Sequence, residues 1–122
     1  MQARTILVVE DEPMVLECTE LALTMSGYNV IGVESAEMAM DLAVGMTETP
    51  DLLITDISMP GMPGPQLAAF LRSKFPSLPI LFTSGFSEEN SGVSNFTDAS
   101  TSFVQKPYSP SKLVDMVKAL IG

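Results

Sequence analysis

Short apolar runs alternate with helix-like segments along the 122 residues, and this alternation limits the possible folds more than any other feature. Residues 6–9 and 52–55 are the clearest runs; each is too short for a helix, and turn residues follow within two positions. Such runs are typical of strands buried in a parallel sheet. Their alternation with helices predicts right-handed βαβ units, and therefore an α/β fold with helices on both faces of the sheet.

The expected architecture is a doubly wound, flavodoxin-like sheet of five parallel strands in the order 2-1-3-4-5. The predicted strands are residues 4–9, 28–33, 52–56, 79–83 and 103–104. The predicted helices begin at Pro13, after Asp11 or Glu12 as N-cap, at Ser35, at Gly64-Pro65 and at Ser109-Pro110. Residues 85–102 are rich in Ser, Asn, Gly and Thr, so only a short or irregular fourth helix is expected there.

Each predicted helix carries apolar residues at a spacing that indicates an inward face. The expected inward residues are Met14, Cys18, Leu21 and Met25 in the first helix, Ala39, Leu42, Ala43 and Met46 in the second, Leu67, Phe70 and Leu71 in the third, and Leu113, Val117 and Leu120 in the last. On this pattern Cys18 is expected to be buried filler and not a reactive thiol.

The composition excludes several classes of function. The net charge of −9 argues against direct nucleic-acid binding, because phosphate contacts need a basic face. No apolar stretch approaches the roughly 20 residues of a membrane span, and the first residues lack a signal-peptide layout. A single cysteine allows no internal disulfide, so we expect a cytoplasmic protein. The absence of histidine removes the usual general base and zinc ligand.

Carboxylates follow two of the predicted strands. Glu10 and Asp11 come after the first strand, and Asp56 ends the third, which lies beside it in the expected order. Like charges that close disfavour joint ionisation, so a cation is expected among them. Oxygen-only ligands favour Mg²⁺, bound by Asp11 and Asp56, by Glu10 directly or through water, and by the backbone carbonyl of Ser58. The alternative for Glu10 and Asp11 alone is an acidic helix start, which the helix dipole favours.

Two further polar residues are expected at the same end of the sheet. Lys106 follows the fifth strand, where it can pair with the carboxylates and with a phosphoryl group. Ser84 follows the fourth strand and can donate to a phosphoryl oxygen. Taken alone, these are more often a surface lysine and a turn serine. Together with a cation and the carboxylate nucleophile Asp56, they indicate phosphoryl transfer onto that aspartate, which needs no histidine base.

Over essentially its whole length the chain resembles the receiver domain of two-component response regulators, of a stand-alone or hybrid-kinase type. The matching segments are Glu10-Asp11-Glu12-Pro13, residues 56–64, Thr83-Ser84-Gly85 and Lys106-Pro107. The resemblance implies one receiver domain, residues 1–122, without an output domain. It implies that Asp56 accepts a phosphoryl group from a sensor histidine kinase or a histidine phosphotransfer protein, with Mg²⁺ as cofactor. Such a protein is no enzyme in the ordinary sense; it assists its own phosphorylation and dephosphorylation.

The same resemblance assigns roles to single residues. Glu10 and Asp11 match the acidic pair, Ser84 the switch hydroxyl, and Lys106 the lysine of the family. Ser58 matches the residue whose backbone carbonyl binds the metal ion. Phe103 matches the switch aromatic, although it lacks the hydroxyl of the tyrosine found in many members. A downstream protein is expected to bind the face made by residues 85–102, the fifth strand and the final helix.

Three other functions fit parts of the same sequence less well. A degenerate receiver could bind partners without any phosphate, although the intact cluster argues against it. An aspartate-nucleophile phosphatase needs a second aspartate two residues after the nucleophile, where this chain has Ser58. The chain also lacks the glycine-rich signatures of flavin-binding and nucleotide-binding proteins. A further hypothesis gives Phe86 the role of shielding the phosphorylated aspartate from water.

Overall fold

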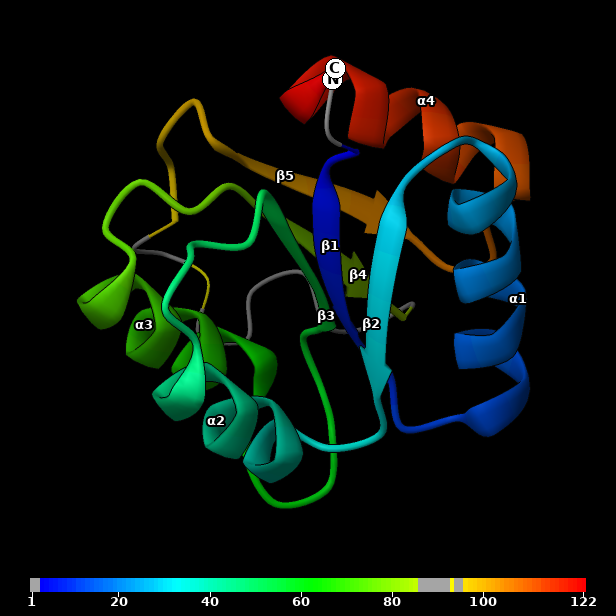
Figure 1. Ribbon diagram of the computed structural model, residues 1–122. Helices are drawn as coiled ribbons and strands as arrows, with labels where there is room; N and C mark the ends of the chain where they lie inside the picture. Colours follow the sequence, from blue (N-terminus) through cyan, green and yellow to red (C-terminus); the bar gives the residue numbers. More distant parts are fainter. Residues whose placement is uncertain (1–2, 86–92, 94–95) are drawn as a thin grey trace.

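The computed structural model describes residues 3–85, 93 and 96–122, and it contains five parallel strands in the order β2-β1-β3-β4-β5 (Figure 1). The strands are β1 (Thr5–Val9), β2 (Asn29–Val33), β3 (Leu52–Asp56), β4 (Ile80–Ser84) and β5 (Thr101–Gln105). The described helices are α1 (Pro13–Met25), α2 (Ala36–Gly45), α3 (Gly64–Lys74) and α4 (Pro110–Ile121). The predicted fold class and strand order are therefore confirmed.

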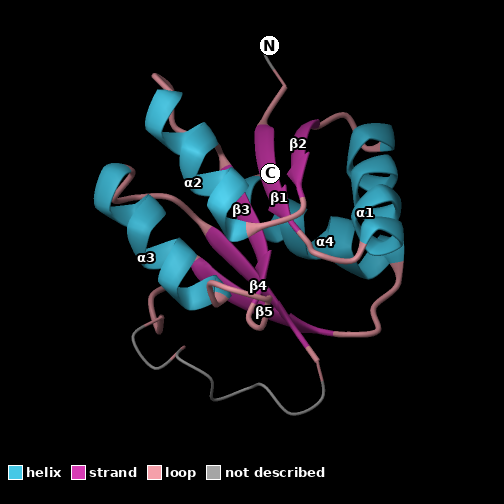
Figure 2. Cartoon of the chain, turned by 90° about the horizontal axis from the view of Figure 1, so that it is seen from below, coloured by secondary structure: helices cyan, strands magenta, loops and turns pink. Residues whose placement is uncertain are grey.

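Helices cover both faces of the sheet. Helices α2 and α3 lie side by side on one face, while α1 and α4 lie on the other (Figure 2). None of the four described helices combines the length and apolar character needed to cross a lipid bilayer. The short helix predicted within residues 85–102 falls largely on residues 86–92 and 94–95, which lie outside the described part of the chain, as does Phe86.

Alternation along β1 divides the core into two layers. Ile6 and Val8 pack in the cluster under α1 and α4, whereas Leu7 and Val9 pack in the cluster under α2 and α3. This is the period of two that a strand covered on both faces requires. Every residue of β3 is buried as well, so the side chains at the carboxyl ends of β1 and β3 extend from strands that are packed on both faces.

The predicted helix starts are largely confirmed. The Ser35 side chain accepts a hydrogen bond from the Met38 amide, and Ser109 caps α4 in the same way. Pro13 and Pro110 occupy the first turns of α1 and α4, where the missing N–H costs nothing. These starts fix where each helix leaves the sheet.

The predicted inward face of α1 is wrong. Its four residues lie outward, with Met14 79%, Leu21 62% and Met25 78% exposed, and Cys18 is exposed as well. The buried residues of α1 are Leu16, Thr19 and Leu23. Because α1 is apolar on more than one side, its spacing fits two faces, and contact with β1 and β2 selects the second.

The inward faces of the other helices are mostly confirmed, because Ala39, Ala43, Leu67, Leu71, Leu113 and Val117 are buried and Met46, Phe70 and Leu120 are half-buried against the core. Leu42 is the exception, being 37% exposed. Helix α2 buries three alanines, so it lies close to the sheet and needs no bulky side chain on its flank.

Candidate functional site

Three carboxylates meet at the carboxyl ends of β1 and β3. Glu10 follows β1, Asp11 comes next in the chain, and Asp56 is the last residue of β3. One carboxylate oxygen of each residue lies within 4.8 Å of the corresponding oxygens of the other two. Glu10 and Asp56 are buried, at 3% and 5% exposure, and Asp11 is half-buried. The structure thus brings together the three acidic residues that the sequence placed in one site.

Lys106 reaches this cluster from the loop after β5. Its Nζ lies 2.9 Å from Asp56 Oδ1 and 2.9 Å from Glu10 Oε1, with Glu12 Oε1 at 3.7 Å. The Lys106 backbone amide donates to the carbonyl of Ser84 at 2.8 Å, and the Lys106-Pro107 peptide bond is cis. One ammonium group therefore serves two buried carboxylates.

Burial and the crowding of carboxyl groups change the ionisation of the site. Burial, together with the neighbouring Glu10 carboxyl, raises the pKa of Asp56 to about 7, against the lowering effect of hydrogen bonds from Thr83 and Lys106. Burial also works against the Lys106 ammonium, but its hydrogen bonds to Glu10 and Asp56 outweigh burial and raise the pKa of Lys106. With Lys106 as its cationic partner, the Asp56 carboxylate is thus still harder to ionise than a carboxylate in water.

An oxygen-only cluster of this kind fits Mg²⁺. Glu10, Asp11 and Asp56 offer hard carboxylate ligands, and no histidine is available anywhere in the chain. A divalent cation would also favour the ionised form of Asp56, against the burial and the neighbouring Glu10 carboxyl that raise its pKa. The residues present therefore suit a divalent metal ion in both ligand type and charge.

Thr83 is a site residue that sequence reasoning missed. Its Oγ1 donates a hydrogen bond to Asp56 Oδ1, and the residue is only 2% exposed. Thr83 and Asp56 are register partners on the neighbouring strands β4 and β3, so their side chains project from the same face of the sheet. Both residues stand near the ends of predicted strands, and this could have indicated the contact. The pairing of Thr83 with Asp56 follows, however, only once the register of the two strands is known.

The loop after β3 folds back tightly against the site. The Gly64 amide donates to the Ile57 carbonyl at 2.8 Å, and a Cβ at Gly64 would lie 1.8 Å from the Asp56 carbonyl oxygen. Only glycine fits there, and its position holds the start of α3 against the end of β3. Ser58 lies exposed within this loop.

The two predicted switch residues lie on neighbouring strands. Ser84 is the last residue of β4 and is buried at 9% exposure. Phe103, on β5, is 41% exposed, and its ring stacks on Phe82 with centroids 5.4 Å apart. The aromatic ring therefore lies on the outside of the molecule, with one side against the core.

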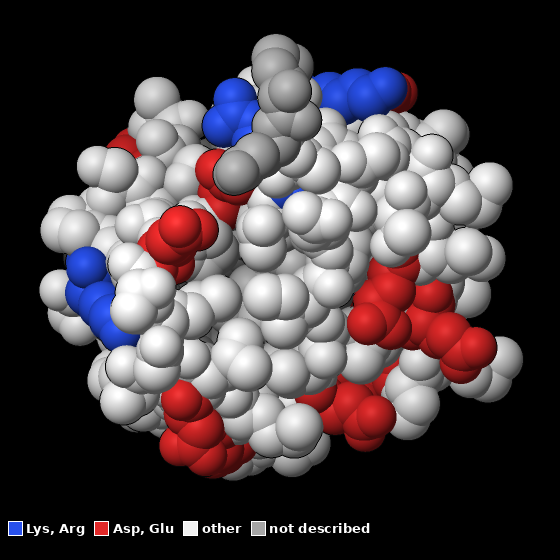
Figure 3. Space-filling view, in the orientation of Figure 1, with Lys and Arg blue, Asp and Glu red and all other residues white. Residues whose placement is uncertain are grey.

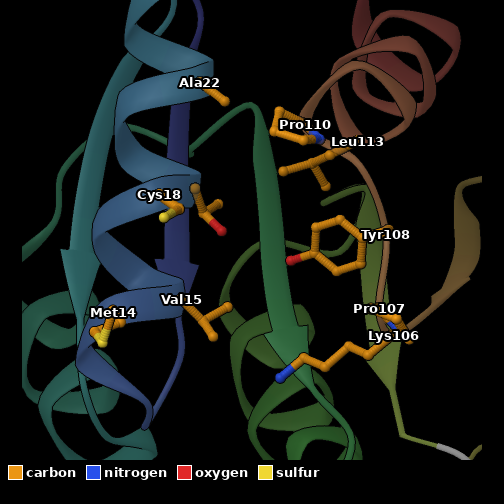
Figure 4. A pocket seen from close by; sticks show the side chains of 10 residues that line it. Met14, Val15, Cys18, Ala22, Lys106, Pro107, Tyr108, Pro110 and Leu113 are labelled. Carbon is orange, nitrogen blue, oxygen red and sulfur yellow. The ribbon is translucent and has the colours of Figure 1, made fainter.

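An apolar groove opens beside Lys106, between α1 and α4 (Figure 4). Its volume is about 400 Å³, and Met14, Cys18, Tyr108 and Leu113 are among the residues that line it. Burial in this groove raises the pKa of the Tyr108 hydroxyl. Elsewhere on the molecule, Asp and Glu side chains form several patches on the face shown in Figure 3, in line with the net charge of −9. The site therefore adjoins an apolar surface within an acidic molecule.

The fold and the site together define a doubly wound α/β domain with an acidic cluster and a lysine at the carboxyl ends of its strands. The chain belongs to the response regulator receiver domain family, whose model matches residues 6–118. This confirms the family that the sequence motifs indicated.

Relatives include regulators and a kinase. The chain is 32% identical over 115 residues to the response regulator protein FleR of Pseudomonas aeruginosa, covering 94% of this chain and 24% of FleR. It is 32% identical to the sensor kinase CckA of Brucella abortus, covering 96% of this chain and 12% of that kinase. The chain thus spans about a quarter or less of these two curated relatives.

Among solved structures, the response regulator TrrA of Thermotoga maritima in complex with Mg²⁺ and BeF is 31% identical, with a TM-score of 0.80 and coverage of 96% of this chain and 98% of that chain. The receiver domain of the hybrid histidine kinase CckA is 30% identical, also with a TM-score of 0.80, covering 97% of this chain and 99% of that chain. Both similarities extend over almost the whole fold.

Proposed function

We propose that this receiver domain accepts a phosphoryl group on Asp56 in a Mg²⁺-dependent reaction and changes conformation in response. The observation that carries the proposal is the buried Asp56 carboxylate with Lys106 Nζ at 2.9 Å and two further carboxylates within 4.8 Å. The phosphodonor is a phosphohistidine of a sensor histidine kinase or a histidine phosphotransfer protein. The kinase CckA among the relatives supports a partner of this class.

The chemistry follows from the positions of the side chains. An oxygen of the ionised Asp56 carboxylate attacks phosphorus; the O–P bond forms while the bond from phosphorus to the donor breaks, and its electron pair leaves with the donor. Glu10, Asp11, Asp56 and the Ser58 carbonyl would hold Mg²⁺, which would supply charge neutralisation for the phosphoryl oxygens. Lys106 is already beside the acceptor and can pair with the incoming phosphoryl group.

The conformational response involves Ser84 and Phe103. In this proposal the Ser84 hydroxyl moves toward the phosphoryl group, and Phe103 turns inward into the space that Ser84 leaves. The exposed position of the Phe103 ring is the starting state that such a movement requires. A downstream protein then binds the face that includes β5 and α4. The protein acts in the cytoplasm as a phosphoacceptor and has no separate substrate to turn over.

Labelling with radioactive acetyl phosphate tests the proposal. We expect the wild-type protein to incorporate phosphate only with Mg²⁺, and the Asp56→Asn variant to incorporate none, because the amide is not a nucleophile. Asp115→Asn, a change at an exposed position of α4, is the matched control and is expected to label like the wild type. Label retained by Asp56→Asn would contradict the assignment. An unlabelled wild-type protein would favour the degenerate receiver instead.

A further inference from the structure

Thr83 makes a contact that the roles assigned above do not use. It lies one residue before the end of β4 and is buried, and its Oγ1 donates to Oδ1 of the acceptor Asp56. Lys106 Nζ contacts the same oxygen at 2.9 Å. Two donors thus bind Oδ1, and in the proposed reaction Oδ2 is the oxygen that bonds to phosphorus.

The side chains of the two donors, Lys106 and Thr83, differ in conformational freedom. Lys106 has a long flexible stem, and its ammonium can follow a phosphoryl group. Thr83 has a short, β-branched side chain on the buried strand β4, in register with Asp56 on β3. We therefore expect its hydroxyl to stay at Oδ1 after phosphorylation.

We propose that the Thr83 hydroxyl shortens the lifetime of the phosphorylated Asp56. This inference rests on the proposed function. A hydrogen bond to an ionised carboxylate is roughly twice as strong as one between neutral groups. Once Oδ2 is bonded to phosphorus, Oδ1 is a neutral carbonyl oxygen, so Thr83 stabilises the free carboxylate more than the acyl phosphate.

The same bond favours the hydrolysis step. A water oxygen bonds to phosphorus, the P–Oδ2 bond breaks, its electron pair returns to the carboxylate, and the proton of the water passes to the released phosphate. In a loose transition state the leaving carboxylate already carries most of its charge. Thr83 therefore stabilises that transition state relative to the acyl phosphate, and hydrolysis is faster with the hydroxyl than without it.

The experiment compares the decay of labelled Asp56 after removal of acetyl phosphate in the wild type, Thr83→Val and Thr83→Ser. Valine keeps the shape and removes the donor, so the half-life is expected to rise about fivefold, the equivalent of about 1 kcal/mol. Serine restores the hydroxyl and brings the half-life back to within about twofold of the wild type. The initial labelling rate changes less than the half-life, because the attacking carboxylate keeps most of its charge in the loose transition state. A purely structural defect would move both rates.

Thr55→Val is the matched control. Thr55 is also a fully buried threonine beside the site, but its hydroxyl donates to the Asp56 backbone carbonyl and not to the carboxylate. Its half-life is expected to stay near that of the wild type. A metal-free readout is the ¹³Cγ resonance of Asp56, which is expected to shift in Thr83→Val and to stay in place in Thr55→Val. Should Thr83→Val fail to fold, Thr83→Cys, a weak donor of similar size, takes its place with an intermediate half-life.

The outcomes separate the two proposals. A labelled wild type with an unchanged half-life in Thr83→Val overturns the role of Thr83 and leaves the proposed function standing. Equal lengthening in Thr55→Val, or an unmoved Asp56 resonance in Thr83→Val, also overturns it. A wild type that takes no label overturns both.

Discussion

At the scale of single residues, Arg72 joins helix α3 to the segment that enters β5. Its Nε donates to the Leu78 carbonyl at 3.0 Å, and its two terminal nitrogens bind the Asp98 carboxylate at 2.9 and 3.0 Å. One of them also reaches Thr101 Oγ1, and the guanidinium lies 5.6 Å from the centre of the Phe96 ring. The guanidinium lowers the pKa of Asp98 to about 2. The arrangement needs the planar, forked geometry that arginine alone provides.

Arg72→Lys is therefore expected to loosen β5 without unfolding the protein. An ammonium group cannot bind Asp98 with two parallel bonds and also reach the Leu78 carbonyl, so about 1–2 kcal/mol of local stability is lost. Hydrogen exchange of the β5 amides should accelerate about tenfold, as followed by mass spectrometry. Arg4→Lys is the control, since Arg4 makes only a 3.6 Å ion pair at 54% exposure. Unchanged exchange in Arg72→Lys would show that the fork does not hold the strand.

Residue-scale prediction from the sequence succeeded where position along the chain was enough. Glu10, Asp56 and Lys106 come together because each stands at the carboxyl end of a strand, and strand ends can be read from apolar runs. Their chemical roles remain predictions. The contact of Thr83 with Asp56 could not be predicted, because it depends on the register of β4 against β3, which no local sequence pattern encodes.

At the scale of elements, α1 shows that the spacing of apolar residues can predict the wrong buried face of a helix. Leu21 and Leu23 are only two positions apart, yet Leu21 is 62% exposed and Leu23 is fully buried. The spacing of a helix that is apolar on more than one side does not show which side faces the core, and only packing on the sheet decides. The ends of a strand are equally hard to predict from local sequence alone. Strand β5 extends over Thr101–Gln105 and not just residues 103–104, because pairing with β4 outweighs its polar composition.

The two leucines give a matched test of the observed face. Leu21→Ala is expected to change the free energy of unfolding by no more than about 0.5 kcal/mol, because the side chain is already in water. Leu23→Ala removes a buried side chain and leaves a cavity, so a loss of about 2–5 kcal/mol is expected. Urea denaturation measures both. A larger loss for Leu21→Ala than for Leu23→Ala would contradict the observed face and support the one predicted from spacing.

At the scale of the whole molecule, the acidic site works against the stability of the fold. The chain carries 15 acidic and 6 basic residues, and its buried carboxylates share one lysine. Since the pKa of Asp56 is raised in the folded protein from 3.8 to about 7, ionising this group costs free energy of folding. The proposed phosphoryl transfer needs Asp56 in its ionised form, whereas the stability of the fold favours its protonated form.

This conflict predicts how stability depends on pH in the absence of metal. Between about pH 4 and pH 7 the folded state keeps a proton on Asp56 that the unfolded chain releases, so the free energy of unfolding falls as the pH rises and levels off above about 7. Asp56→Asn removes this titration and is expected to be more stable than the wild type at pH 8, with a flatter profile. Urea denaturation at pH 5 and pH 8 in chelator measures the difference.

Asp115→Asn, at an exposed position, should keep the wild-type profile. At pH 8, a divalent cation that binds the folded site adds about 2.7 kcal/mol at one hundred times its dissociation constant. Added Mg²⁺ should therefore stabilise the wild type at pH 8 and have much less effect on Asp56→Asn, because the variant has lost a charged ligand. Identical pH profiles for the wild type and Asp56→Asn would mean that the acceptor carboxylate carries no such cost, and that the charge in the site is already balanced without a metal ion.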